Sequence, residues 1–308
     1  MEYKNLDLSD HKTLCDVANL CLPMYKLQLD DLVNLFRWKH VANPFGLSLA
    51  IGAFDQKKLV AVRIFMRWEF SLNDTVLRAF RPVDTFTSPT YQRRGIFQKL
   101  TETALEVSKS QKIDLIFNTP NNISRNGYEK LGWRLARNEW VYVRVFSPFR
   151  IVTTLLLNKL LNKESKKVTI ESFEQHTDFG TAFDTVFRSD KFSTNVNYDF
   201  LKWRYLDYDS KYVSQYREGN SILLYKINNR NGLRELMILD SFGFKDLKSP
   251  ISHINKLHKA DYLILKGDAK NIYSGTLFKR PSLDLYEYPI SNSSMKNINL
   301  SIGDLESF

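Results

Sequence analysis

The stretch from Tyr91 to Leu100 places a glycine and two arginines between an expected strand and an expected helix. Residues 81–87 predict the strand, and residues 96–110 have the apolar spacing of an amphipathic helix. Backbone N–H groups at a helix N-terminus lack intrahelical partners, so phosphate binds well there. Gly95 permits a tight turn and a close approach of the ligand, because it has no Cβ. The stretch predicts a phosphate-binding loop, and a basic surface turn is the alternative.

A second group of residues with recognisable spacing follows that helix. Residues 114–117 predict a buried strand, and residues 118–133 then read NTPNNISRNGYEKLGW. The two stretches together resemble the acetyl-CoA-binding core of the GNAT superfamily of N-acetyltransferases. In that core the loop reads Gln/Arg-x-x-Gly-x-Gly/Ala, and an Asn after the next strand precedes a small residue and then Tyr-x-x-x-Gly-Phe/Trp. The matching residues are Gln92, Gly95, Asn121, Ser124, Tyr128, Gly132 and Trp133.

One loop position departs from the family pattern. Phe97 stands where Gly or Ala is usual, so its side chain must point away from the cofactor. The resemblance implies an α/β fold of the mixed α+β type, with helices flanking a mixed, mostly antiparallel sheet, and a duplication of it in two tandem domains. It also implies acetyl-CoA as the acyl donor, with its pantetheine arm on the backbone of a splayed strand, 83–87, and its pyrophosphate on the loop. The residues expected to bind it are Thr85, Phe86, Thr87, Gln92, Arg93, Arg94, Gly95, Ile96, Phe97, Asn121 and Ser124.

Two residues are the catalytic candidates. Tyr128 is expected to protonate the departing thiolate, since a phenol within hydrogen-bond reach can act as a general acid, and the alternative is a side chain that only packs on the sheet. Asp84 is the first candidate for the general base, because it lies just before the expected cofactor-binding bend. Glu69 and His40 are further candidates, and a chain of water molecules needs no side-chain base. Asn121 has an alternative role as the N-cap of the helix that follows.

The composition narrows the class of protein and its partners. The chain has 308 residues, of which 43% are hydrophobic, and a net charge of +10, so it is globular and favours anionic partners such as CoA phosphates or nucleotide-linked substrates. No block of Lys and Arg is long enough to predict nucleic-acid binding. Cys15 and Cys21 have no metal-type spacing with the five histidines, so no metal site is expected. A polar N-terminus and the lack of an apolar run of roughly 20 residues predict a cytoplasmic enzyme.

The order of expected elements divides the chain in two. We expect a GNAT acetyl-CoA-binding catalytic domain over 1–148, a linker helix over 149–167 and a degenerate GNAT-like second domain over 168–308. The linker has an apolar face of leucines with lysines around it. One interpretation is a helix that lies on a membrane surface or on a partner. We favour the other, in which the leucine face packs on one of the domains.

A weak internal repeat supports the duplication. Trp38 in the first half and Trp203 in the second are each followed by a basic residue, preceded by a helical pattern and succeeded by a predicted hairpin. The second hairpin turns at an Asn-Gly pair, which is a strong turn signal. Both tryptophans are expected to be packing anchors. The second half has no Gln-x-x-Gly loop after residues 237–241, so we expect that it cannot bind CoA in the same way.

The acceptor is the least defined part of the prediction. The leading hypothesis is acetylation of a primary amine on a small molecule, an amino sugar or a sugar-nucleotide, by analogy with enzymes of similar tandem architecture. Basic and aromatic residues on neighbouring strands suit a bulky anionic acceptor; they are Arg63, Arg67, Trp68, Arg78 and Arg81. One alternative is a peptide or protein-lysine acetyltransferase. The other is a non-catalytic CoA-binding module, which Phe97 at the usual small position favours.

Overall fold

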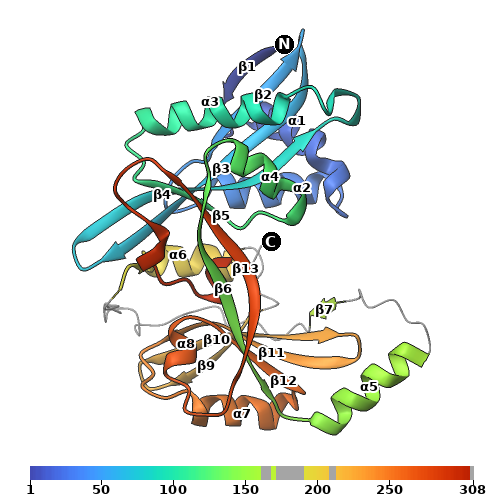
Figure 1. Ribbon diagram of the computed structural model, residues 1–308, viewed down its shortest axis with the longest axis vertical. Helices are drawn as coiled ribbons and strands as arrows, with labels where there is room; N and C mark the ends of the chain where they lie inside the picture. The colour runs from blue at the N-terminus through green and yellow to red at the C-terminus, as the bar shows by residue number, and fades with distance from the viewer. Residues whose placement is uncertain (161–167, 171–190, 208–212, 306–308) are drawn as a thin grey trace. The chain divides into compact units, whose positions relative to one another are not determined.

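The computed structural model describes residues 1–160, 168–170, 191–207 and 213–305. Their contacts divide the chain into two compact units, and Figure 1 shows strands and helices in both. Unit 1 comprises Met1–Asn138, Asp190–Asn195 and Asp284–Ile298. Unit 2 comprises Glu139–Ser189, Val196–Leu283 and Asn299–Phe308.

The sheet of unit 1 is mixed and mostly antiparallel, which confirms the predicted fold class. Its strands neighbour one another in the order β1 (Glu2–Leu6), β2 (Leu49–Asp55), β3 (Lys58–Leu72), β4 (Thr75–Thr87), β5 (Leu115–Asn118) and the last residues of β13 (Phe278–Pro289). These neighbours pair antiparallel except for β4 and β5, which run parallel. A short strand, β8 (Ser193–Thr194), pairs antiparallel with β3.

Helices of unit 1 pack on its sheet, and the helix predicted over 96–110 is among them. α1 (His11–Cys21) starts at an N-cap, where the carboxylate of Asp10 accepts the Thr13 N–H at 2.8 Å. α3 has the predicted bounds and packs on β2 and β3, whereas α1 contacts β3 and β4. The remaining helical segments are η1 (Leu22–Met24), α2 (Leu29–Phe36), its π-helical continuation η2 (Arg37–Val41), η3 (Pro89–Tyr91), α3 (Ile96–Ser110), α4 (Asn122–Lys130) and η7 (Met295–Asn297).

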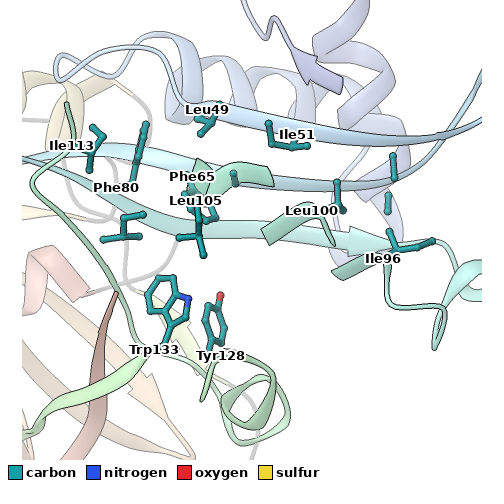
Figure 2. Packing of buried hydrophobic residues seen from close by; sticks show 14 of the residues in the cluster. Leu49, Ile51, Phe65, Phe80, Ile96, Leu100, Leu105, Ile113, Tyr128 and Trp133 are labelled. Carbon is teal, nitrogen blue, oxygen red and sulfur yellow. The ribbon is translucent and has the colours of Figure 1, made fainter. Parts of the chain in front are cut away.

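One hydrophobic core fixes both motif segments of unit 1 to the sheet. Ile96 and Leu100 recur along one face of α3 and are buried against the sheet that contains Phe65 and Phe80. Tyr128 belongs to the same cluster and packs edge-to-face on Trp133, with ring centroids 4.9 Å apart. Figure 2 shows these two rings side by side beneath the strands. The predicted loop and the predicted general acid are therefore held by a shared core.

Unit 2 repeats the layout of a sheet with helices on it. Its strands neighbour one another in the order of the later part of β6 (Arg134–Val145), β12 (Tyr262–Leu265), β11 (Leu233–Phe242) and β10 (Ser221–Arg230), and β10 also pairs with β7 (Val168–Ile170) and β9 (Ser214–Glu218). Here β11 and β12 run parallel. The helical segments are α5 (Pro148–Leu160), α6 (Tyr198–Lys202), its π-helical continuation η5 (Trp203–Asp207), α7 (Lys248–His258), α8 (Asp268–Asn271) and α9 (Ile302–Leu305).

The elements of the two units follow one another in the same order. In unit 1 the order is α2 with η2, β2, β3, β4, α3, β5 and α4; in unit 2 it is α6 with η5, β9, β10, β11, α7, β12 and α8. Trp38 and Trp203 lie at corresponding places, in η2 and η5, and both are buried. A detail before the parallel strand recurs as well: the carboxylate of Asp114 accepts the backbone N–H of Arg78 at 2.7 Å, and that of Asp261 accepts the N–H of Arg234 at 2.8 Å.

Two strands carry the chain between the units. β6 begins in unit 1 and pairs with β12 of unit 2, whereas β13 begins in unit 2 and ends beside β5 of unit 1. The compact units therefore do not follow the limits of 1–148 and 168–308, and the division into tandem domains stays a prediction.

The predicted linker helix is present from Pro148 to Leu160, and residues 161–167 lie outside the described part of the chain. One side of α5 contacts the β10–β11 turn, where the Asn158 side chain donates to the carbonyl of Asn231 at 3.0 Å. Ile151 is half-buried, but the leucines and Phe149 are exposed, from Leu155 at 53% to Phe149 at 88%. The favoured interpretation, in which the leucine face packs on a domain, is wrong for the described residues of α5, because none of them is buried.

Candidate functional site

The predicted splay of β4 is visible in the pairing of the strands. β4 and β5 pair only at Ala79 with Leu115 and Phe80 with Ile116, although β4 continues to Thr87. Beyond Phe80, the described partner of β4 is β3, where Arg63 lies opposite Thr85. Backbone groups on the β5 side of residues 83–87 are therefore not used in that ladder. They are what a pantetheine arm, with its amide groups, would need.

A bulge interrupts β4 at the start of this free edge. Phe65 lies opposite Pro82 and Arg63 lies opposite Thr85, so β4 contains one residue more than β3 between these pairs. Bulges bend a strand and redirect its side chains. Asp84 lies inside the bulge, and its side chain turns to residues of α2 and η2.

The predicted phosphate loop ends at an uncapped helix start. Gly95 is the N-cap of α3, has a φ of +73° in the left-handed region, and provides no side chain to cap the helix. Arg93 also has a positive φ, of +60°, which a non-glycine residue rarely adopts. The Gln92 amide donates to the carbonyl of Thr87 at 3.2 Å, and the Arg94 guanidinium lies 5.1 Å from the centre of the Tyr91 ring. The loop thus leaves the first N–H groups of α3 without a side-chain partner.

Phe97 lies against α4 and not across the loop. Its ring packs edge-to-face on Tyr128 at a centroid distance of 5.9 Å. A Cβ at Gly127 would lie 3.3 Å from the Phe97 ring, so the glycine makes room for the larger residue. Ile96 is buried in the core, so its contact with a bound cofactor would come from its backbone.

The two polar residues at the start of α4 bond to each other. The Asn121 side-chain oxygen accepts the Ser124 N–H at 2.9 Å and the Ser124 hydroxyl at 3.0 Å. This is N-cap geometry, which was the alternative role of Asn121. The backbone there is held at the start of α4, whose later turn presents Tyr128.

Asp84 is buried in a charged network. Its carboxylate accepts hydrogen bonds from Lys39 Nζ at 2.8 Å, from His40 Nε2 at 2.9 Å, and from the Tyr25 hydroxyl. Burial alone would raise the pKa of Asp84, but the positive charge of Lys39 and the His40 hydrogen bond outweigh it and hold the pKa well below the usual range. Burial and the charge of Asp84 raise the pKa of Tyr25, so that its hydroxyl stays a donor. A carboxylate held in this way takes up a proton poorly.

The other candidate bases are engaged as well. His40 is fully buried, and its second ring nitrogen lies 3.1 Å from the Ser48 hydroxyl, while burial lowers its pKa. Glu69 accepts a hydrogen bond from Asn195 at 3.0 Å. Nothing in the sequence marks Tyr25 and Lys39 as partners of Asp84, because the contact joins residues far apart in the chain.

The structure brings together only some of the residues assigned to an anionic acceptor. Arg67, Trp68 and Arg78 line one pocket, which Glu69 and Gln111 also line. Arg67 donates to the Gln111 side chain at 2.6 Å, whereas Arg81 lies over the ring of Phe117. Trp68 is buried and donates to the Thr194 hydroxyl at 3.0 Å. Arg63 instead reaches the predicted cofactor site, where it donates to Thr85 and Tyr128.

Comparison with known proteins gives a family for the first half of the chain. Residues 2–136 match the family of acetyltransferase (GNAT) domains. None of the curated proteins matches the chain. No helix in the described part of the chain is long and apolar enough to cross a membrane.

Several solved structures share the fold. A GCN5-related N-acetyltransferase from Kribbella flavida matches with a TM-score of 0.60 at 12% identity, over 94% of this chain and 71% of that one. A probable N-acyltransferase from Enterococcus faecalis V583 matches with a TM-score of 0.62 at 10% identity, over 94% and 72%. Eis1 from Mycobacterium abscessus matches with a TM-score of 0.57 at 11% identity, over 94% and 74%. At these identities the likeness establishes the fold alone.

Proposed function

We propose that this protein, an acyltransferase whose residues 2–136 form a GNAT acetyltransferase domain, transfers the acetyl group of acetyl-CoA directly to a primary amine. The observation that supports this most is the edge of β4 that no described strand pairs with beyond Phe80, together with the N-terminus of α3, which has no side-chain cap. The first suits the amides of a pantetheine arm, and the second suits a pyrophosphate. Both lie in unit 1, together with Tyr128.

The chemistry needs few protein groups. An acetyl thioester supplies an electrophilic carbonyl and a thiolate leaving group. The amine nitrogen attacks the carbonyl carbon, the carbon–sulfur bond breaks, and one proton leaves the nitrogen while one is delivered to the sulfur. In this proposal the β4 backbone orients the donor, and the Tyr128 hydroxyl delivers the proton to sulfur.

The proton of the attacking amine also needs an acceptor. Asp84 is the carboxylate within the bulge of β4, but its lowered pKa makes it a weak base. We therefore assign it first to holding Lys39 and His40 in place. A water chain then carries the amine proton away, and Asp84 is the side chain to test against it.

For the acceptor we propose an amino sugar or a sugar-nucleotide, on the net charge of +10 and on the analogy with tandem enzymes. A peptide or protein lysine is the alternative acceptor. A non-catalytic CoA-binding module loses its main support, because Phe97 packs on α4 beside Gly127.

The test is release of free thiol from acetyl-CoA in the presence of a panel of amino sugars, sugar-nucleotides and lysine peptides. We expect turnover with one acceptor class, and Tyr128→Phe should lower kcat by about a hundredfold. Tyr225→Phe is the matched control, because Tyr225 is also buried and its hydroxyl lies 3.1 Å from His258 in unit 2. Cofactor binding without turnover on any amine would leave a CoA-binding module. Equal effects of the two substitutions would remove Tyr128 from the chemistry.

A further inference from the structure

Arg63 is a buried cation that no carboxylate neutralises in the described part of the chain. It is 1% exposed, and no acidic residue described in unit 1 forms an ion pair with it. One nitrogen of its guanidinium, Nε, is buried without any hydrogen-bond partner. Buried charges are normally paired, because an uncompensated charge in the interior is costly. An arginine kept in this state is therefore a candidate for function.

The two terminal nitrogens of Arg63 are directed to the predicted site. Nη1 donates to the Thr85 hydroxyl at 2.6 Å, on the strand β4, whose other edge no described strand pairs with at this point. Nη2 donates to the Tyr128 hydroxyl at 2.6 Å. The guanidinium thus links the expected pantetheine strand to the expected general acid.

This contact fixes the role of the Tyr128 hydroxyl. A guanidinium has donors only, so the phenol oxygen must accept, and the phenol proton points elsewhere. Among the described residues no acceptor takes that proton. The hydroxyl is therefore held with its proton available to an acceptor that the protein itself does not supply.

The surroundings keep Arg63 in this position. Its guanidinium carbon lies 5.3 Å from the ring centre of Phe65, 4.9 Å from that of Phe97 and 5.1 Å from that of Tyr128. Aromatic faces attract a guanidinium without neutralising its charge. Phe97 is thereby explained, since a Gly or Ala at that position would leave this side of the arginine open.

We propose that Arg63 is a positioning residue that orients the Tyr128 hydroxyl toward the sulfur of CoA and stabilises negative charge on that sulfur. The proposal rests on the proposed function, because it takes the sulfur to lie beside Tyr128. The thiolate that forms when the carbon–sulfur bond breaks would accept the Tyr128 proton, while Arg63 remains a hydrogen-bond donor to the phenol oxygen throughout.

The first test measures binding and needs no amine. Calorimetry compares CoA with desulfo-CoA, which lacks the sulfur, at a pH at which free CoA is largely thiolate. The full-length wild type should prefer CoA by about tenfold, as for a charge-assisted hydrogen bond. Arg63→Met, which keeps the approximate volume, should lose that preference, and Arg63→Lys, which keeps the charge, should retain part of it. Equal preference in wild type and Arg63→Met would overturn the proposal.

The second test is a kinetic cycle with the best amine. Arg63→Met should lower kcat by about tenfold with little change in the KM for acetyl-CoA, and the double variant with Tyr128→Phe should be no slower than Tyr128→Phe alone. If the two substitutions lower kcat independently and additively, Arg63 has only a packing role. The same holds if kcat falls only in proportion to the thermal midpoint of unfolding.

The two tests together separate this proposal from the proposed function. If the wild type prefers CoA to desulfo-CoA but acetylates no amine, the proposed function fails and the sulfur site stands. If it binds neither compound, both fail.

Discussion

The two units contain the same arrangement of a bulged strand and a π-helix, but the aspartate in each has a different electrostatic environment. In unit 1, Asp84 lies in a bulge of β4 and is bound by His40 from the π-helix η2. In unit 2, β11 has a bulge at the corresponding place, and Asp240 is bound there by the Tyr205 hydroxyl from the π-helix η5. The protein thus contains two versions of one arrangement, in which a π-helix holds an aspartate of a bulged strand.

The difference lies in what surrounds each carboxylate. Asp84 faces Lys39, whose charge, with the His40 hydrogen bond, holds its pKa below the usual range in spite of burial. Burial raises the pKa of Asp240 to about 7, and the neighbouring charge of Asp304 acts in the same direction. One scaffold therefore keeps an ionised acid in unit 1 and an acid that still binds a proton near neutral pH in unit 2.

The cofactor-related residues differ in the same way. Arg63 lies opposite Thr85 on β3, whereas the corresponding position of β10, opposite Ser241, is the buried Leu223. The helix after β4 starts at Gly95, but the helix after β11 starts from Leu247, which has no side-chain cap and a negative φ. At these described positions unit 2 repeats the backbone arrangement without the arginine and the glycine N-cap, and its inability to bind CoA in the same way stays a prediction.

The largest effect on stability is expected from removing the charge of Asp84, and the matching substitution of Asp240 is its control. Asp84→Asn leaves Lys39 buried without its counter-charge, and breaking a buried pair in this way costs about 3–5 kcal/mol. Asp240→Asn at pH 4, where the acid is protonated in the folded state and largely protonated in the unfolded state, replaces it by a neutral amide, so it should change stability by less than about 1 kcal/mol. Thermal and urea unfolding of the two full-length variants measure both. Equal losses in the free energy of unfolding would mean that the residues around Asp84 and those around Asp240 do not differ in charge.

The pH dependence of stability sharpens this comparison. The pKa of Asp240 is raised from 3.8 to about 7. Its contribution to the stability of the fold is therefore fully present below pH 3.8 and is lost as the pH rises to about 7. The pKa of His40 is lowered by burial, so its contribution is present above 6.5 and is lost as the pH falls below that value. As the pH rises from 4 to 7, the free energy of unfolding of wild type should fall relative to that of Asp240→Asn. Over the same range it should rise relative to that of His40→Gln.

Unfolding of these three proteins in urea, at a series of pH values, checks the opposite signs. Asp84 should not change the pH dependence of the free energy of unfolding in this range, because its stabilising contribution is lost only as the pH falls through its lowered pKa. Parallel curves for wild type and Asp240→Asn would contradict the raised pKa.

A smaller effect separates the loop of unit 1 from an ordinary turn in unit 2. Gly95 and Gly219 both have a positive φ, of +73° and +56°, and an added Cβ at either would meet nothing within 4 Å. Alanine at either site should cost about 1 kcal/mol through the backbone alone. Only Gly95→Ala should weaken acetyl-CoA binding, as measured by calorimetry. Equal affinities in the two variants would remove the loop from the site.

Local signals predicted most of the fold and part of the site. The bounds of α3 and the hairpin of β2 and β3 follow from periodicity and turn residues, which are local. The return of β13 to β5 and the contact of Lys39 with Asp84 depend on segments far apart in sequence, and single-sequence patterns do not encode them. Sequence alternation places Arg63 with the other basic residues of its strands, because alternation gives the face of a side chain but not its partners.

The central claim is that unit 1 alone carries a site for acetyl-CoA. Calorimetric titration of acetyl-CoA into the full-length protein tests it most directly, because it reports affinity and stoichiometry together. We predict one cofactor bound per chain with micromolar affinity, and loss of that binding when Gly95 is replaced by valine. Two cofactors per chain, or binding that survives the Gly95 substitution, would contradict the claim, and so would the absence of any binding.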